Sequence, residues 1–150
     1  MTSIWIDGDA CPKAIKEIIF KAAIRNKIKC ILVANQFMNL PPSPMIQRII
    51  VDQGFDKADQ LIIESILTGD IVITSDIPLA ESCINKQAKV ISPRGELFNA
   101  NTIKQKLAIR DFNEVMRSSG LHSKGPNSLT QKDIKLFANQ LDRLLVKAKK

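Results

Sequence analysis

Two aspartates flank a single glycine directly after a short apolar stretch near the start of the chain. Residues 4–6 are apolar and predict a buried strand, and Asp7 and Asp9 follow at its end. Pro12 suits the first turn of a helix. Open α/β sheets bind ligands beyond the carboxyl ends of their strands, so these acids occupy the position of a site. Two carboxylates this close repel each other unless a cation or a proton lies between them.

Three further acids occupy comparable positions. The apolar run 71–76 predicts another strand, which ends in Asp76, and Asp56 and Asp59 open a predicted helix. Carboxylates without a convergent histidine favour Mg²⁺ or Mn²⁺, and the single histidine, His122, lies in a late loop. An alternative role for Asp56 and Asp59 is to cap their helix and interact with its dipole. The candidate metal ligands are therefore Asp7, Asp9, Asp56, Asp59 and Asp76.

Several residues near these acids could contact a substrate. Two roles are open for each of them. The hydroxyls of Thr74 and Ser75 either orient a water or a phosphate, or simply end the strand. The side chains of Arg94 and Arg110 either bind phosphate or are surface cations. The candidate substrate-binding residues are Thr74, Ser75, Arg94, Arg110 and Lys124. Cys11 lies beside the acids, but neighbouring carboxylates raise the pKa of a thiol and disfavour the nucleophilic thiolate. We therefore interpret Cys11 as a small packed residue.

Strand patterns alternate with helix patterns along the first hundred residues. This alternation predicts an α/β fold with a parallel sheet and right-handed crossovers. The strands are expected within residues 4–7, 27–35, 45–51, 71–76 and 88–92. Helical spacing is expected at about 12–26, 56–67, 78–86, 102–118 and 130–147. The last two helices have no strand between them, so they are expected to pack on the body.

The excess of positive charge is confined to the last third of the chain. The 150 residues carry a net charge of +7, yet residues 1–100 hold 11 basic and 11 acidic side chains. Residues 101–150 hold the other 11 basic side chains and only 4 acidic ones. We expect one domain over 1–150, with 101–150 a basic helical extension packed on it. This distribution favours a polyanionic partner such as RNA, although ordinary solubility explains it equally well.

Cysteine use and hydropathy point to a cytoplasmic protein without a membrane partner. The three cysteines are widely spaced and form no Cys-x-x-Cys pair, which is typical of a reducing compartment. Lysines and arginines interrupt the longest apolar run before it reaches membrane-spanning length. The first residues carry acids, whereas a secretory signal begins with basic residues.

An ordered set of motifs resembles the YaiI/YqxD family of bacterial proteins. The motifs are DGDACP at 7–12, VANQ at 33–36, GFDKAD at 54–59, GDIVITSDIPLA at 69–80, PRGE at 93–96, RDF at 110–112 and FANQLDR at 137–143. That family has no established activity and is grouped with PIN-like domains, which are metal-dependent nucleases. The resemblance implies a three-layer fold, in which helices flank a parallel sheet of about five strands in the order 3-2-1-4-5. It also implies that Asp7, Asp76 and Asp59 (or Asp56) match the PIN acids, whereas Asp9 and the basic extension depart from that pattern.

The first hypothesis is a cytoplasmic PIN-like ribonuclease. One or two Mg²⁺ or Mn²⁺ ions held by Asp7, Asp76 and Asp59 would activate a water, and the basic helices would bind the RNA backbone. A second hypothesis is a haloacid-dehalogenase-like phosphatase, with Asp7 as nucleophile and Asp9 as acid and base. A third is a non-catalytic RNA-binding protein that keeps the fold and lacks turnover.

Overall fold

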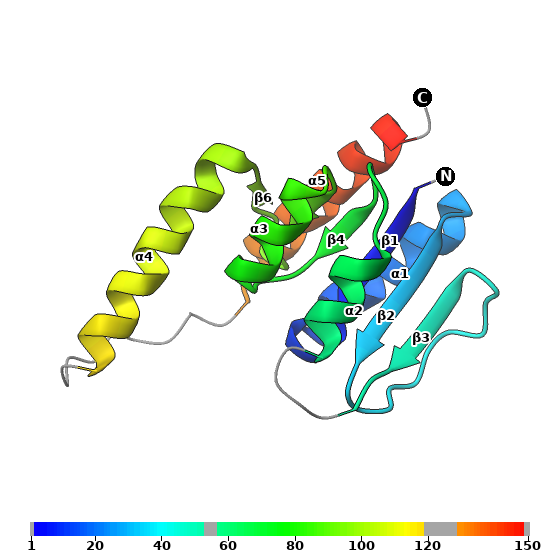
Figure 1. Ribbon diagram of the computed structural model, residues 1–150. Helices are drawn as coiled ribbons and strands as arrows, with labels where there is room; N and C mark the ends of the chain where they lie inside the picture. The colour runs from blue at the N-terminus through cyan, green and yellow to red at the C-terminus, as the bar shows by residue number, and fades with distance from the viewer. Residues whose placement is uncertain (1, 53–56, 119–128, 149–150) are drawn as a thin grey trace.

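The computed structural model describes residues 2–52, 57–118 and 129–148, in which strands and helices alternate (Figure 1). The predicted α/β class is confirmed. The strands are β1 (Ser3–Asp7), β2 (Lys29–Ala34), β3 (Ile46–Ile50), β4 (Ile71–Ile73), β5 (Lys89–Ile91) and β6 (Leu97–Phe98). The helices are η1 (Gly8–Ala10, a 3₁₀ turn), α1 (Lys13–Asn26), α2 (Lys57–Ser65), α3 (Ile77–Asn85), α4 (Ala100–Ser118) and α5 (Gln131–Ala148).

The six strands form one sheet in the order β3-β2-β1-β4-β5-β6. The first five run parallel, as expected, and their order agrees with the 3-2-1-4-5 arrangement. The sixth strand was not predicted. It pairs antiparallel with β5 after a tight turn in which Gly95 has a φ of +89°. A strand of two residues is too short to produce a recognisable alternation in the sequence.

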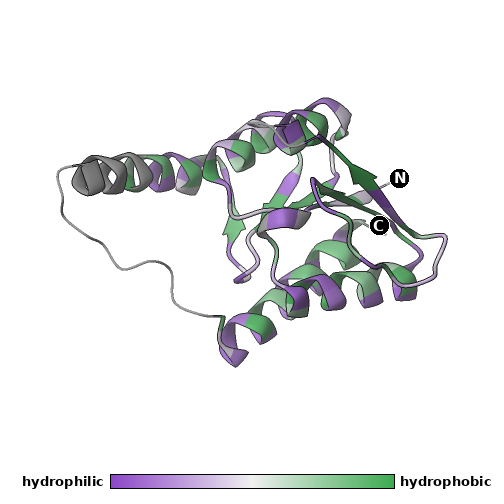
Figure 2. Ribbon diagram, turned by 90° about the horizontal axis from the view of Figure 1, so that it is seen from below, coloured by the Kyte–Doolittle hydropathy of each residue, from purple (hydrophilic) through white to green (hydrophobic). Residues whose placement is uncertain are grey.

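Helices cover both faces of the sheet, which gives the three layers seen from below in Figure 2. Successive side chains of a strand point to opposite faces. On β1, Ile4 and Ile6 join the core formed with α1 and α5. Trp5 joins the other core, formed with α2, α3 and the start of α4. By the same alternation, Asp7 lies on the α2 and α3 side of the sheet.

Helix α5 packs on the body through one apolar stripe. Phe137, Leu141 and Leu145 are almost fully buried in the core shared with α1. Its basic side chains are exposed, as the helical spacing predicted: Lys132, Lys135, Arg143 and Lys147. Helix α4 packs against α3 at its start and then extends beyond the edge of the sheet (Figure 1). Within the described residues, no helix is both long enough and apolar enough to cross a bilayer.

Strand β4 is shorter than the sequence pattern indicates. The pattern predicts a strand over 71–76, but the strand ends at Ile73, and Asp76 is the N-cap of α3. The reason is local, because the Thr74 hydroxyl and the Asp76 carboxylate both accept bonds from nearby backbone N–H groups. These side-chain acceptors draw the backbone out of the sheet ladder and into a helix start.

Candidate functional site

Asp7 is a buried carboxylate at the end of the central strand. Its side chain is only 7% exposed. The parallel register places Ile6 opposite Ile73, so Thr74, the next residue after Ile73, is level with Asp7. The Thr74 hydroxyl donates a hydrogen bond of 3.0 Å to Oδ2 of Asp7. The structure therefore fixes the orientation of this carboxylate through the neighbouring strand end.

Thr74 also contacts the second acid predicted for the site. Its Oγ1 accepts a hydrogen bond of 3.0 Å from the backbone N–H of Asp76. The carboxylate of Asp76 in turn accepts the backbone N–H of Leu79 at 3.1 Å, which caps α3. Thr74 itself is 1% exposed, and its hydroxyl connects the carboxylate of Asp7 to the backbone of Asp76. One buried side chain thus links the acids at the carboxyl ends of β1 and β4.

Asp9 is exposed and is held by the end of the neighbouring strand. The backbone N–H of Asn35 donates to its Oδ2 at 2.9 Å. With the Asn35 amide nitrogen turned toward Asp9, this nitrogen lies 3.1 and 3.2 Å from the two carboxylate oxygens. The sequence interpretation missed this role for Asn35. It could have been found from the parallel pairing of β1 with β2, because residues that follow two adjacent strands lie side by side.

The acids of this site repel one another. Burial is the main cause that raises the pKa of Asp7, and the negative charges of Asp76 and Asp9 raise it further. The hydrogen bond from Thr74 lowers the pKa of Asp7 but does not cancel these effects. Asp76 and Asp9 are therefore near enough to act on Asp7 electrostatically. A divalent cation between these carboxylates would relieve the repulsion.

Asp59 and Asp56 are the remaining predicted metal ligands. Asp59 is half-buried in the first turn of α2. Burial is the main cause that raises the pKa of Cys83 on α3, and the charge of Asp59 raises it further, so the two residues lie near each other. Asp56 lies outside the described residues. Among the residues that are described, no three His, Cys, Asp or Glu side chains form a group ready to hold a metal ion. The convergence of five carboxylates stays a prediction.

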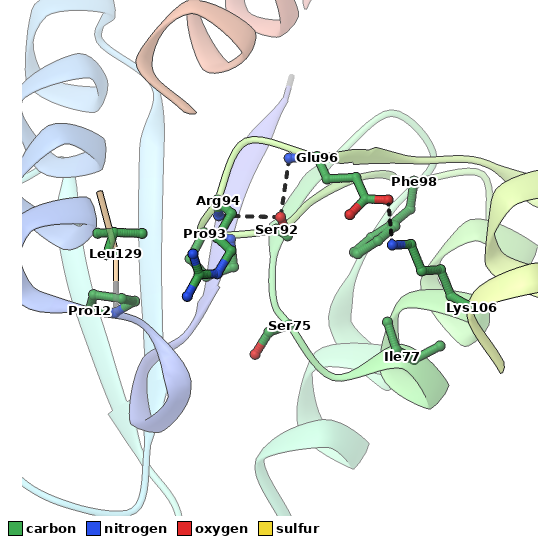
Figure 3. Close-up of a pocket in the computed structure, with 10 residues that line it drawn as sticks. All are labelled: Pro12, Ser75, Ile77, Ser92, Pro93, Arg94, Glu96, Phe98, Lys106 and Leu129. Carbon is green, nitrogen blue, oxygen red and sulfur yellow. Dashed lines mark hydrogen bonds and ion pairs between the residues drawn. The ribbon is translucent and has the colours of Figure 1, made fainter. Parts of the chain in front are cut away.

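A cavity of about 380 Å³ is lined by residues that lie close in the sequence to two of these acids, Ser75 beside Asp76 and Pro12 three positions after Asp9 (Figure 3). Two of the predicted substrate-binding residues, Ser75 and Arg94, line it. Arg94 forms an ion pair of 2.7 Å with Asp133 at the start of α5. Arg110 lies in α4, but its side chain is not among those described, and Lys124 lies outside the described residues.

Two other buried groups have structural roles. Asp70 is 2% exposed and accepts three hydrogen bonds, from the backbone N–H groups of Ser3 and Leu67 and from the Trp5 indole. It therefore ties the amino-terminal end of β1 to the turn before β4. Burial raises the pKa of the Cys11 thiol to about 12, so Cys11 is protonated at neutral pH. This agrees with its interpretation as a packed residue.

The sequence matches a known family over almost its full length. The family model described as "Uncharacterized BCR, YaiI/YqxD family" covers residues 5–147. The chain belongs to the YaiI/YqxD family. The match includes every acid of the candidate site and the PRGE turn. No solved structure matches this YaiI/YqxD chain, so the arrangement above is described from this chain alone.

Proteins of several bacteria are similar to this chain over almost its full length. A UPF0178 protein of Legionella pneumophila (strain Corby) is 52% identical over 98% of this chain and 99% of its own length. A UPF0178 protein of Saccharophagus degradans is 53% identical over 98% of this chain and 97% of its own. A UPF0178 protein of Shewanella amazonensis is 51% identical over 98% of this chain and 99% of its own length. These names carry no activity, so function is argued from the site.

Proposed function

We propose that this YaiI/YqxD protein is a divalent-metal-dependent phosphodiester hydrolase that acts on RNA. The observation that supports this most directly is the link from Asp7 through Thr74 to Asp76. These acids follow β1 and β4, the two central strands, whose crossovers leave in opposite directions. Ligands of open α/β sheets collect at such a switch point.

The donor set suits Mg²⁺ or Mn²⁺. Magnesium keeps several waters and is commonly bound by one or two carboxylates together with substrate phosphates, so Asp7 and Asp76 suffice. When bound, the ion supplies a polarised water and positive charge for the phosphodiester oxygens. Thr74 orients the Asp7 carboxylate, in the manner of the outer partners of metal ligands, and bonds to the backbone of Asp76. Asp9, held by Asn35, is a further exposed carboxylate that follows β1. Asp59 on α2 is proposed as the third ligand, after Asp7 and Asp76.

The activity is tested by incubating mixed-sequence single-stranded RNA with the purified protein and Mn²⁺. Cleavage is expected with Mn²⁺ and is lost in EDTA. Asp76→Asn is expected to lower the rate by at least about 100-fold, because even outer partners of metal ligands contribute 10- to 100-fold. Glu64→Gln, at an exposed position on α2, is the matched control and should leave the rate unchanged.

Three outcomes contradict this proposal in different ways. Equal cleavage by the wild type and Asp76→Asn would indicate a contaminating nuclease. Hydrolysis of a simple phosphate monoester without RNA cleavage would favour the phosphatase alternative. RNA binding with neither reaction would favour a non-catalytic binding protein.

The RNA partner is proposed from the charge of α5, and it predicts a salt dependence. Each phosphate contact by a lysine or arginine releases counterions, so the logarithm of RNA affinity should fall linearly with the logarithm of salt concentration, by roughly 0.7 per contact. A flatter slope is expected when the exposed basic residues of α5 become glutamine: Lys132, Lys135, Arg143 and Lys147. The control makes the same change at four exposed lysines elsewhere: Lys21, Lys29, Lys86 and Lys89. Equal slopes for both quadruple variants in a fluorescence titration would rule out α5 as the RNA-binding face.

A further inference from the structure

We propose that the cavity beside the carboxylates binds the uncharged part of a nucleotide, its base and ribose, next to the phosphate that is cleaved. This inference rests on the proposed function and adds where the substrate lies. Its support comes from the position of the cavity, its lining and its charge.

Two residues that line the cavity lie close to the acids in the sequence. Ser75, an exposed residue of its wall, lies between Thr74 and Asp76 in the sequence. Pro12, on another wall, follows the turn that carries Asp9. Figure 3 shows Ser75 and Pro12 on the side of the cavity opposite the β5–β6 turn. A group bound here therefore contacts residues that shortly follow β1 and β4 in the chain.

Size and lining suit a flat organic group. Apolar side chains form much of the wall: Pro12, Ile77, Pro93 and Phe98. Phe98 is 6% exposed, so the core holds its ring rigidly. Ligand pockets typically have volumes of about 300–1,000 Å³ and combine such walls with a few polar groups. A volume of about 380 Å³ lies in this range and is enough for one nucleoside.

The charges of the cavity are already balanced. Arg94 pairs with Asp133 at 2.7 Å, and Lys106 on α4 pairs with Glu96 at 3.0 Å. A phosphate in the cavity would have to compete with these carboxylates for the two cations. An uncharged base and sugar would not, so the phosphate is assigned to the side of Asp7 and the nucleoside to the cavity.

The turn that carries Arg94 is rigid. The Ser92 hydroxyl accepts hydrogen bonds from the backbone N–H groups of Arg94 and Glu96, at 3.2 and 3.1 Å. Gly95 lies against the backbone of α5, so this wall is held on its outer side as well. A preformed wall loses little entropy when a ligand binds.

The test measures binding of adenosine, adenosine 5′-monophosphate and inorganic phosphate by calorimetry, without RNA. Ser75→Phe and Glu96→Trp fill the cavity from opposite walls at exposed positions. Each variant is expected to lower the affinity for adenosine by at least about 10-fold, a loss of 1.4 kcal/mol of binding free energy. Asn85→Phe, at the other end of α3, is the matched control and should bind adenosine as the wild type does.

Adenosine binding, measured apart from Mn²⁺ binding and RNA cleavage, separates this inference from the proposed function. If wild type binds adenosine and both filled variants do not, the cavity assignment holds, even if no Mn²⁺ binding or RNA cleavage is found. If both filled variants bind adenosine as tightly as the wild type, or if inorganic phosphate displaces adenosine, the assignment is wrong. Either result would leave the hydrolase proposal intact if RNA cleavage by the wild type still depends on Mn²⁺.

Discussion

Asp7→Asn is expected to abolish metal-dependent cleavage while it makes the metal-free protein more stable. The substitution removes the charge of a proposed metal ligand, so Mn²⁺ affinity and the rate of RNA cleavage should each fall by at least about 100-fold. Calorimetry with Mn²⁺ and the cleavage assay measure the two losses separately. A residue with a purely structural role would not combine these losses with a gain in stability.

The gain in stability follows from the pKa of Asp7. Burial raises this pKa in the folded protein, so the native state binds the proton more tightly than the unfolded state does. The free energy of unfolding therefore falls as the pH rises from the ordinary value of Asp through the raised one. Asparagine keeps an oxygen that accepts the Thr74 hydroxyl and carries no charge. At pH 7 in EDTA, urea unfolding should show a gain on the order of 1 kcal/mol, the usual scale of single substitutions.

Asp70→Asn provides the contrast for this stability measurement. Asp70 is also buried but accepts hydrogen bonds from three N–H groups, and an amide would turn its own donor toward one of them. This variant should lose roughly 1–3 kcal/mol, the cost of an unsatisfied buried group. If Asp7→Asn also loses stability in EDTA, Asp7 is a structural acid like Asp70, and the proposed site is wrong.

Gly95→Ala is expected to have the largest effect on stability. Gly95 has a φ of +89°, and a Cβ atom there would lie 2.7 Å from the backbone nitrogen of Phe137 and 2.8 Å from the carbonyl carbon of Leu136. Backbone atoms of a helix cannot move alone, so α5 would have to shift away from the sheet. Strain and overpacking together predict a loss of roughly 2–6 kcal/mol.

Gly69→Ala is the matched control for this loss. Gly69 has nearly the same φ, +88°, but a Cβ atom there would meet nothing within 4 Å. Its loss should be limited to backbone strain, about 1–3 kcal/mol. Urea unfolding of both variants measures the difference. Equal losses would mean that Gly95 is required for its dihedral angle alone and that α5 tolerates a side chain there.

The sequence predicts those parts of the structure that are determined by residues close together in the chain. Apolar runs such as 4–6 and 71–73 predict buried parallel strands, and the position of Asp7 directly after one of them identifies it as a candidate ligand. Partners that lie far apart in the sequence are not predictable from such local patterns. Arg94 contacts Asp133 across 39 residues, and no strand pairing expected from the sequence places these two residues together.

The boundary of β4 shows a different limit. Thr74 is β-branched and follows three apolar residues, so its intrinsic preference favours a strand. Its hydroxyl instead bonds to Asp7 and to the backbone of Asp76, and the strand ends before it. Side-chain hydrogen bonds of this kind depend on which strand lies alongside, and a linear pattern does not contain that information.

The Asp7–Thr74 bond also has a consequence for the chain during translation. The two residues are 67 positions apart, so the ribosome releases Asp7 several seconds before Thr74, at roughly 5–20 residues per second. The apolar face later covered by Phe137 and Leu141 remains open longer still. A nascent or prematurely terminated chain therefore lacks the hydrogen bond between Thr74 and Asp7, and it exposes an apolar surface. The candidate site therefore exists only in the completed chain.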